Sequence, residues 1–355
     1  MSYGKRAQQG FHFGLSNHYP LRSQDFRNIW GHHMVDGLGK SGGGGLFSSD
    51  SQVQSQPGLT VSESAAKTVE QCLAELDALV GLSEVKTQVR KLLSMQQANA
   101  VRREADLPEV PLALHLVFTG DAGTGKTTVA RIVGSLYRAA ELLPKGTMVE
   151  TDRSGLVGAY VGHTAIKVTE VMNEADGGVL YIDEAYSLFQ GGERDFGSEA
   201  VATLVKGMED KRNSLAVIVS GYENEMKEFI DSNPGLRSRF QTYIKFPNYT
   251  ADELLEIFSR MAKAHQISVS DEVSEHLLAH FRSIDVGGSR GNARYVRNLF
   301  EAMFSEMALA ASADGVIEKS ELLTFELAHV PELANDGHTH GTQRFGFAQA
   351  NPEEV

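Results

Sequence analysis

The chain has 355 residues, of which 41% are hydrophobic and 22% are charged, and its formal net charge is −13. This length predicts two folded units with tails, and the composition is that of a soluble globular protein. The absence of any run of eighteen apolar residues predicts that no segment spans a membrane. The acidic balance argues against general nucleic-acid binding, because most of the surface would repel a phosphate backbone, although it leaves room for a local basic groove.

The first sixty residues differ in composition from the rest of the chain. They hold 11 of the 35 glycines and eight serines, and five basic against three acidic residues leave them a charge of +2. Such a stretch buries too little apolar surface to offset its ordering entropy, so we expect residues 1–60 to be disordered. A short docking motif built on its aromatic residues is the alternative. With no apolar signal sequence and a single cysteine, Cys72, we expect a cytoplasmic location.

From about residue 61 onward, the pattern predicts alternating helices and strands. Helical spacing of apolar residues predicts a helix over 83–105, and another begins at Lys126. Short apolar segments predict five strands, at 112–119, 148–151, 177–183, 214–220 and 242–246. Continuous apolar strands that alternate with helices are typical of a parallel sheet covered on both faces. We therefore predict a five-stranded parallel α/β domain over residues 61–248.

The strand pattern ends near residue 249, and helical spacing takes over. The predicted helices cover 251–265, 271–283, 291–312 and 318–329. They indicate a second, all-helical domain over residues 249–331. The polar residues 332–355, rich in Gly, His, Asn and Pro, predict a flexible C-terminal tail.

The segment Gly120–Thr127, GDAGTGKT, fits the phosphate-loop pattern G-x-x-x-x-G-K-[ST]. It lies between a predicted buried strand and a predicted helix, as the motif requires. Glycines let backbone N–H groups surround phosphates, and the helix N-terminus adds its dipole. Lys126 would reach the outer phosphates, and the Thr127 hydroxyl would hold Mg²⁺. The predicted ATP-binding residues are Asp121, Ala122, Gly123, Thr124, Gly125, Lys126, Thr127 and Thr128.

A pair of acidic residues, Asp183 and Glu184, ends the apolar segment GGVLYIDEA. Open α/β sheets bind ligands at the carboxyl ends of their strands. Asp183 would suit the magnesium shell, and Glu184 would suit a base that orients the attacking water. Two acids at a strand end are weak evidence alone, but after a phosphate loop they indicate a hydrolase.

The phosphate loop is followed, in order, by YIDEA, SGYENEM, NPGLRSRF and GGSRGNAR. This series resembles AAA+ ATPases, and most of all the CbbX/CfxQ branch, which includes SpoVK-like and EccA-like ATPase domains. The resemblance covers about residues 75–330. It implies an AAA+ large domain followed by a small helical lid, hydrolysis of ATP with Mg²⁺, and assembly into a hexameric ring.

The resemblance also implies that an arginine reaches the γ-phosphate held by the neighbouring subunit. NPGLRSRF places Arg237 and Arg239 at this position, and we favour Arg239. A guanidinium supplied by the next subunit would stabilise the transition state only in the assembled ring. From spacing alone, a surface pair of salt bridges would be the better interpretation of these two arginines.

Further roles implied by the resemblance concern nucleotide sensing. GNAR places Arg294 at the start of a lid helix, where it would sense the nucleotide. DALVGLSEVK places Val80 and Gly81 against the adenine. A polar sensor after the fourth strand would be Ser220 or Tyr222.

LVGAYVGHTAIKV resembles an aromatic pore loop with Tyr160, Val161 and Gly162 at its tip. An aromatic and aliphatic pair between glycines could grip an extended polypeptide through nonspecific apolar contact. The alternative is a tyrosine buried in the core. Residues 190–197, QGGERDFG, would form a second pore loop or an ordinary flexible loop.

The leading functional hypothesis is therefore an ATP-hydrolysing ring motor that remodels a protein partner at its pore. Resemblance to CbbX suggests a Rubisco-activase type of role, while a type VII secretion or sporulation assembly role is equally open. A nucleic-acid-loading ATPase is disfavoured by the acidic balance. A scaffold whose oligomeric state is set by nucleotide, without remodelling, is the remaining alternative.

Overall fold

The computed structural model describes residues 59–62, 67–160, 162–189, 195–284, 291–313 and 315–333. All of them belong to one of the two units of the chain, Ser49–Val355. The predicted disordered region 1–60 lies outside the described residues except for Leu59 and Thr60. The predicted tail 332–355 lies outside them except for its first two residues. Within the described part, no helix is both long and apolar enough to cross a membrane.

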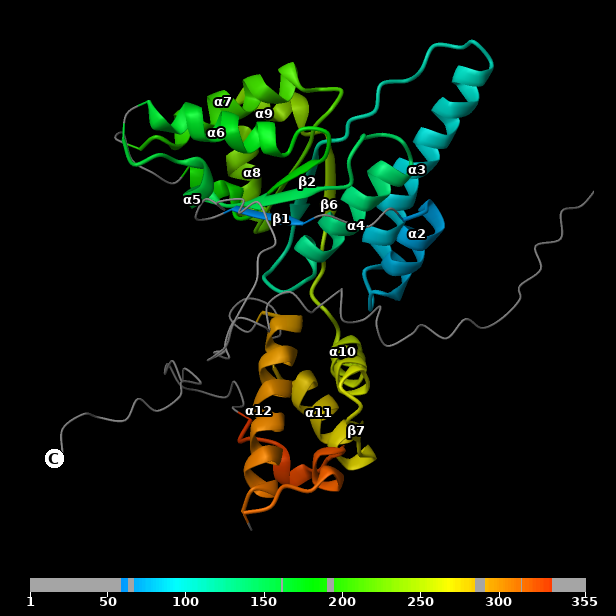
Figure 1. Cartoon of the computed structure of the whole chain (residues 1–355), viewed down its shortest axis with the longest axis vertical. Coiled ribbons are helices and arrows are strands. Elements are labelled where there is room, and N and C mark those ends of the chain that lie inside the picture. The colour runs from blue at the N-terminus through cyan, green and yellow to red at the C-terminus, as the bar shows by residue number, and fades with distance from the viewer. Residues whose placement is uncertain are drawn as a thin grey trace, which may run out of the picture. The chain divides into compact units, whose positions relative to one another are not determined.

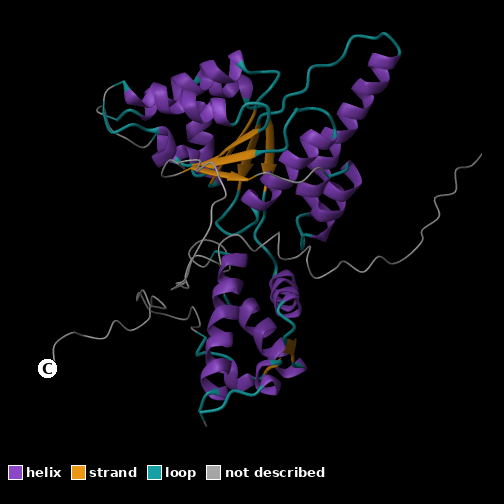
Figure 2. Ribbon diagram, viewed as in Figure 1, coloured by secondary structure: helices purple, strands orange, loops and turns teal. Residues whose placement is uncertain are grey.

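A six-stranded sheet forms the centre of the α/β part (Figure 2). Its strands, in spatial order, are β1 (Leu59–Ser62), β3 (Met148–Thr151), β4 (Val179–Ile182), β5 (Ala216–Gly221), β2 (Leu116–Thr119) and β6 (Thr242–Lys245). The five predicted strands are confirmed, and they pair in parallel. The sixth strand, β1, corrects the prediction because it adds antiparallel to β3 and includes residues expected to be disordered.

The predicted strand at 112–119 is shorter in the structure, where it begins at Leu116. Leu116 is the first residue paired on both sides, with Ile218 of β5 and Thr242 of β6. The residues before it lack partner strands, so apolar composition alone does not make them extended. Strands β2, β4 and β5 are buried at almost every residue, as expected of a parallel sheet covered on both faces.

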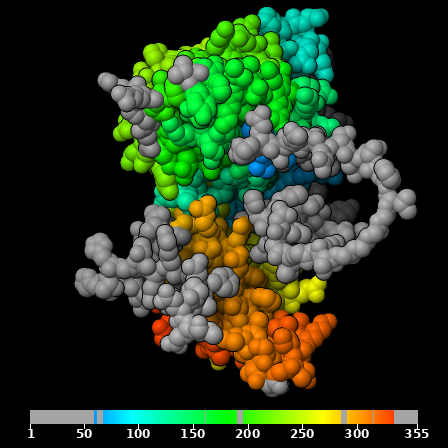
Figure 3. Space-filling model, turned by 60° about the vertical axis from the view of Figure 1, so that its left-hand side comes forward, coloured from blue at the N-terminus to red at the C-terminus, as the bar shows by residue number. Residues whose placement is uncertain are grey.

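Helices cover the two faces of this sheet (Figure 1). One face packs against α2 (Val69–Ala78), α3 (Ser83–Glu104) and α4 (Lys126–Ala139). The other packs against α6 (His163–Glu174), α7 (Gly197–Asp210), α8 (Glu223–Asp231) and α9 (Pro234–Arg239), with the short α5 (Arg153–Leu156) beside them. Residues from the middle of the chain, in green, cover much of the surface in Figure 3. Alternate residues of β2, β3, β4 and β5 enter two different apolar cores, one on each face of the sheet.

The C-terminal part is helical, with α10 (Ala251–Ala264), α11 (Asp271–Ser283) and α12 (Ala293–Ala311) close to their predicted bounds. The predicted helix at 318–329 is wrong. Two 3₁₀ turns, Lys319–Leu322 and Leu327–His329, flank strand β8 (Thr324–Phe325), which pairs with β7 (Ser268–Val269). Phe325 is fully buried, with its ring centroid 5.5 Å from that of Phe300. Strand pairing and this aromatic packing override the helical spacing of the sequence.

Candidate functional site

The phosphate-loop segment Gly120–Thr127 joins strand β2 to helix α4, as predicted. Gly123 and Gly125 have φ angles of 72° and 94°, a region that side chains with a Cβ rarely adopt. A Cβ on Gly123 would also lie 2.0 Å from the carbonyl oxygen of Gly291. The Thr124 hydroxyl is fully buried and donates to the Asp121 carbonyl at 2.8 Å. The glycines thus permit a tight loop at the N-terminus of a 14-residue helix.

Lys126 is the cation of this loop. Its ammonium donates to the carbonyl oxygens of Gly120 and Asp121, each at 2.8 Å. Burial lowers the pKa of Lys126, and the charges of Asp183 and then Asp121 partly counteract that effect. The positive charge of Arg294 lowers the pKa of Lys126 further. The loop, the acid at the end of β4 and the start of α12 are therefore close enough to interact.

Four side chains form a connected polar group between α4, β4 and β5, which we call the hydroxyl chain: Thr127, Tyr181, Ser220 and Asp183. The Thr127 hydroxyl donates to the Tyr181 oxygen at 3.2 Å. The Tyr181 and Ser220 oxygens are 2.8 Å apart, and Ser220 donates to Oδ1 of Asp183. Because Ile182 pairs with Val219, the next residues along, Asp183 and Ser220, meet at the carboxyl ends of their strands. The two predicted magnesium ligands are thus linked through protein hydroxyls.

Glu184 follows Asp183 and is exposed. Its φ of 47° places it in the left-handed region, and its backbone N–H donates to Oδ1 of Asp183 at 3.2 Å. Burial, and then the charge of Glu184, raises the pKa of the nearby Tyr186 to about 12. The turn therefore presents the Glu184 carboxylate to solvent directly beside the end of β4.

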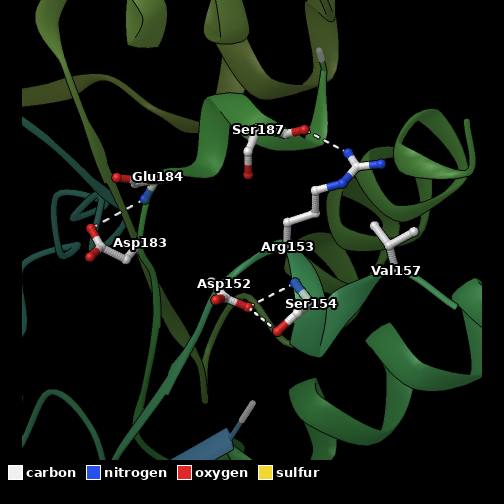
Figure 4. Close-up of a pocket in the computed structure, with 7 residues that line it drawn as sticks. All are labelled: Asp152, Arg153, Ser154, Val157, Asp183, Glu184 and Ser187. Carbon is white, nitrogen blue, oxygen red and sulfur yellow. Dashed lines mark hydrogen bonds between the residues drawn. The ribbon is translucent and has the colours of Figure 1, made fainter. Parts of the chain in front are cut away.

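A cavity of about 510 Å³ opens beside Glu184, at the carboxyl ends of β3 and β4 (Figure 4). Arg153 of α5 spans its rim, since its guanidinium donates to the Ser187 carbonyl at 2.6 Å and pairs with Asp195. Asp152 caps α5 through Oδ1. The lining residues are Asp152, Arg153, Ser154, Val157, Asp183, Glu184 and Ser187.

The lid contacts the phosphate loop at the start of α12. The Asn292 amide donates to the carbonyl oxygen of Ala122 at 3.2 Å, and its Oδ1 accepts from the backbone of Tyr249 at 3.0 Å. The Ala293 N–H donates to the Gly123 carbonyl at 3.2 Å. Arg294, the predicted sensor, is the next residue and is exposed.

The segment Val80–Leu82 borders the same loop from the other side. Val80 is buried, and a Cβ on Gly125 would lie 3.7 Å from Leu82. Gly81 has a φ of 60°, and a Cβ there would lie 2.2 Å from a carboxylate oxygen of Glu253. Leu82, which follows the two residues predicted to contact adenine, therefore lies next to the phosphate loop, and the φ of Gly81 is one that residues with a side chain rarely adopt.

The two arginines of NPGLRSRF differ in their surroundings. Arg237 is exposed and pairs with Asp231 at 3.0 Å. Arg239 is partly buried and pairs with Glu209 at 3.0 Å. The burial of His115, and then the positive charge of Arg239, lowers the pKa of His115 to about 4. In the described part of the chain, Nε of Arg239 is the buried side-chain polar atom that lacks a hydrogen-bond partner. Arg237 is therefore the more exposed of the two arginines, and Arg239 is held by an ion pair on α7 of its own chain.

Tyr160 is 70% exposed, so it is not a core residue. Its ring packs only loosely, edge-on to His163, with a centroid distance of 5.6 Å. A Cβ on Gly162 would meet nothing within 4 Å, which leaves the loop open on that side. Val161 lies outside the described residues, as do residues 190–194 of the predicted second pore loop.

Residues 116–248 match the model of the ATPase family associated with various cellular activities (AAA), and residues 250–337 match the AAA lid domain. Stage V sporulation protein K of Bacillus subtilis (strain 168) is 38% identical over 284 residues, 79% of this chain and 88% of that protein. The chain belongs to the AAA family of ATPases. The CfxQ homolog of Galdieria sulphuraria is 38% identical over 273 residues, 76% of this chain and 90% of that protein. These similarities place this AAA ATPase in the CfxQ branch and support hydrolysis of ATP.

Two further similarities concern function and fold. A chloroplastic ribulose bisphosphate carboxylase/oxygenase activase of Cyanidioschyzon merolae is 37% identical to this AAA ATPase over 262 residues, 73% of this chain and 89% of that protein. The crystal structure of the FIGL-1 AAA domain matches with a TM-score of 0.53 and 17% identity, covering 79% of this chain and 88% of that chain. At this identity, the second similarity supports the fold alone.

Sequence reasoning missed three side chains at the site of this AAA ATPase. Tyr181 of β4 precedes Asp183, the residue directly after the strand, by two positions, so the alternation of side chains along an extended chain could have placed both on one face. Asn292 and Arg153 gave no such signal, because their partners lie far away in the sequence. Only the fold brings these groups to the phosphate loop and to Glu184.

Proposed function

We propose that this AAA ATPase binds ATP with Mg²⁺ on the phosphate loop, at the site formed by residues 120–128 and Asp183. Among the described residues, no group of three His, Cys, Asp or Glu side chains could hold a metal. This fits Mg²⁺, which binds one or two protein oxygens and completes its shell with phosphates and water. Thr127 and Asp183, linked by the hydroxyl chain, would supply those oxygens. The bound ion would neutralise charge that develops on the phosphates during hydrolysis.

Glu184 would orient the attacking water. Its carboxylate is exposed beside the 510 Å³ cavity, so a water has room next to it. Val80 and Gly81 would border the adenine, and Arg294 would sense the phosphates from the lid. We further propose that the α/β domain extends to residue 248 and the lid over 249–331.

In this proposal the site is completed by Arg237 or Arg239 of a neighbouring subunit. Arg237→Ala and Arg239→Ala are each expected to leave ATP binding intact, because neither residue touches the phosphate loop of its own subunit. The variant that removes the arginine acting in trans should lose about 1,000-fold in ATP hydrolysis. The other should retain hydrolysis within a few-fold.

Mixing experiments test whether the arginine acts between subunits. The inactive arginine variant is mixed with Lys126→Ala protein, which keeps its own arginines. Phosphate release should rise above the sum of the two separate proteins, because each variant supplies what the other lacks. Activity in the mixture that never exceeds that sum would contradict a shared site.

We propose further that the ATPase forms a hexameric ring that remodels a protein partner through Tyr160. The single supporting observation is that an aromatic side chain is 70% exposed on a loop that ends at a glycine with open space around it. An exposed aromatic ring can contact apolar side chains of a partner irrespective of their sequence.

Tyr160→Ala should hydrolyse ATP within a few-fold of wild type but should lose remodelling of its partner. Because the side chain is mostly exposed, the melting temperature should change by less than about 2 °C. Remodelling can be followed as unfolding or release of the partner, alongside phosphate release.

Two variants control for this result. Tyr160→Phe keeps the ring and should retain remodelling. Tyr243→Ala removes another tyrosine that is 50% exposed, on the edge strand β6, and should also retain it. Loss of remodelling in Tyr243→Ala as well would indicate a general surface effect, and an unchanged Tyr160→Ala would remove the basis for the pore loop.

The partner would be a protein, and the relatives suggest more than one class for it. A CbbX-like role on Rubisco is supported by the activase of C. merolae, whereas a sporulation role is supported by the protein of B. subtilis at similar identity. A type VII secretion role and a scaffold without remodelling stay as alternatives. Retention of a partner by Glu184→Gln protein in the presence of ATP, and release with ADP, would distinguish a remodelling ATPase from a scaffold.

A further inference from the structure

The hydroxyl chain contains a phenol between the two proposed magnesium ligands. Tyr181 is fully buried on β4, and its oxygen is 3.2 Å from the Thr127 hydroxyl and 3.3 Å from Oδ1 of Asp183. Neither the phosphate-loop pattern nor the acid pair requires a hydroxyl at this position. Its contacts are nevertheless with the side chains that would hold the ion.

The direction of the protons in the hydroxyl chain follows from its acidic end. An ionised carboxylate only accepts hydrogen bonds, so Ser220 must donate to Asp183. The Ser220 oxygen is then free to accept the Tyr181 proton at 2.8 Å. The alternative contact, from Tyr181 directly to Asp183, is longer at 3.3 Å and sends that proton to the same carboxylate. In both cases the Tyr181 oxygen is left as an acceptor for the Thr127 proton.

This order of donors determines whether an oxygen lone pair of the Thr127 hydroxyl is available to bind a cation. A hydroxyl that binds a metal uses an oxygen lone pair, and its proton needs an acceptor elsewhere. The Tyr181 phenol donates its own proton to Ser220 or Asp183 and accepts the Thr127 proton at 3.2 Å. Without Tyr181, the Thr127 proton would lack this acceptor, and the hydroxyl could rotate.

We propose that Tyr181 is a positioning residue that orients the Thr127 hydroxyl and the Asp183 carboxylate for Mg²⁺. This role rests on the magnesium site proposed above. Partners that orient metal ligands typically change metal affinity by 10- to 100-fold when removed. Removal of the Tyr181 hydroxyl should therefore change how the nucleotide affinity depends on the Mg²⁺ concentration. It should leave the nucleotide affinity in the absence of Mg²⁺ unchanged.

The test is Tyr181→Phe, measured by binding of a fluorescent ADP analogue over a range of Mg²⁺ concentrations and in EDTA. Mg²⁺ should increase the affinity for the nucleotide, and the Mg²⁺ concentration at which half of this increase is reached should rise about tenfold in the variant. Affinity in EDTA should stay within about twofold of wild type, because the phosphate loop and Lys126 are unchanged. An unchanged Mg²⁺ dependence in a folded Tyr181→Phe protein would overturn the role.

Tyr137→Phe is a matched control. Tyr137 is 1% exposed on α4, the helix that Thr127 also belongs to, and its hydroxyl donates to the Leu114 carbonyl at 3.2 Å. Its removal should lower the melting temperature without moving the Mg²⁺ dependence. If both phenylalanine variants shift the Mg²⁺ dependence equally, the effect is one of general destabilisation and the role is wrong.

A second variant covers the case in which Tyr181→Phe does not fold. Tyr181→Met also removes the hydroxyl, and its flexible apolar side chain adapts to a buried position, so it should shift the Mg²⁺ dependence in the same direction. No shift would again contradict the role of Tyr181. Wild-type protein that binds nucleotide without any dependence on Mg²⁺ would instead refute the proposed magnesium site itself, so the two failures are distinguishable.

Discussion

Lys126→Ala is expected to lower the affinity for ATP by about 100-fold or more, which corresponds to about 2.7 kcal/mol. The ammonium lies within the phosphate loop, where it contacts two backbone carbonyls, and no other cation of the loop replaces it. Charge-assisted hydrogen bonds to phosphate are among the strongest that proteins make. Titration with a fluorescent ATP analogue measures the loss directly.

The control for Lys126→Ala is Lys167→Ala. The Lys167 ammonium of α6 also contacts two backbone carbonyls, those of Ser154 and Val157. Its removal should leave nucleotide affinity within about twofold, because it lies outside the phosphate loop. Retained ATP binding by a folded Lys126→Ala protein would contradict the assignment of the loop.

Glu184→Gln is expected to keep nucleotide binding and to lose hydrolysis by about 10²- to 10⁴-fold, the usual contribution of a general base. Glutamine has nearly the same shape and tolerates the φ of 47° about as well as glutamate, so the backbone turn should persist. Phosphate release measures the loss of turnover, and binding of a fluorescent ADP analogue measures the retained affinity.

An exposed carboxylate away from the cavity provides the comparison. Glu223→Gln removes the partner of Lys245, a pair at 2.7 Å on the surface, and should leave hydrolysis near the wild-type rate. Hydrolysis at the wild-type rate by Glu184→Gln would remove Glu184 from the mechanism.

The phosphate loop could be predicted from the sequence because its chemistry is local. Eight consecutive residues supply the glycines, the lysine and the hydroxyl, and the flanking strand and helix confirm their setting. The end of β4 was predictable for the same reason, since apolar residues lead directly into Asp183 and Glu184. Local patterns determine these elements, and tertiary context adds little.

Strand β1 could not be predicted because its stability comes from a distant partner. Its four residues follow a glycine-rich and serine-rich stretch and become a strand only by pairing with Met148–Thr151. The predicted helix at 318–329 was wrong for a related reason, because Phe325 packs against Phe258 and Phe300, which belong to other elements. Spacing along one segment does not report contacts that another segment supplies.

The motif NPGLRSRF predicted where arginines lie but not how they are held. The ion pairs of Arg237 and Arg239 involve residues six positions before and thirty positions before, respectively. Their difference in exposure is therefore a property of how α7, α8 and α9 pack. The choice between them needs the two alanine variants, because the proposed site is completed by a neighbouring subunit.

Asn292 has a consequence for how opening of the lid could be observed. Its one side chain joins Ala122 of the phosphate loop, the backbone of Tyr249 at the start of the lid, and Asn248 at 2.9 Å. An amide is suited to this place because it both accepts and donates, whereas aspartate would lose both donated bonds. Displacement of the lid from the loop must break the bond from Asn292 to Ala122, whereas the bond to Tyr249 lies within the lid and can persist. The amide proton of Ala293, which donates to the Gly123 carbonyl of the loop, would then exchange with deuterated water at a rate that reports lid opening.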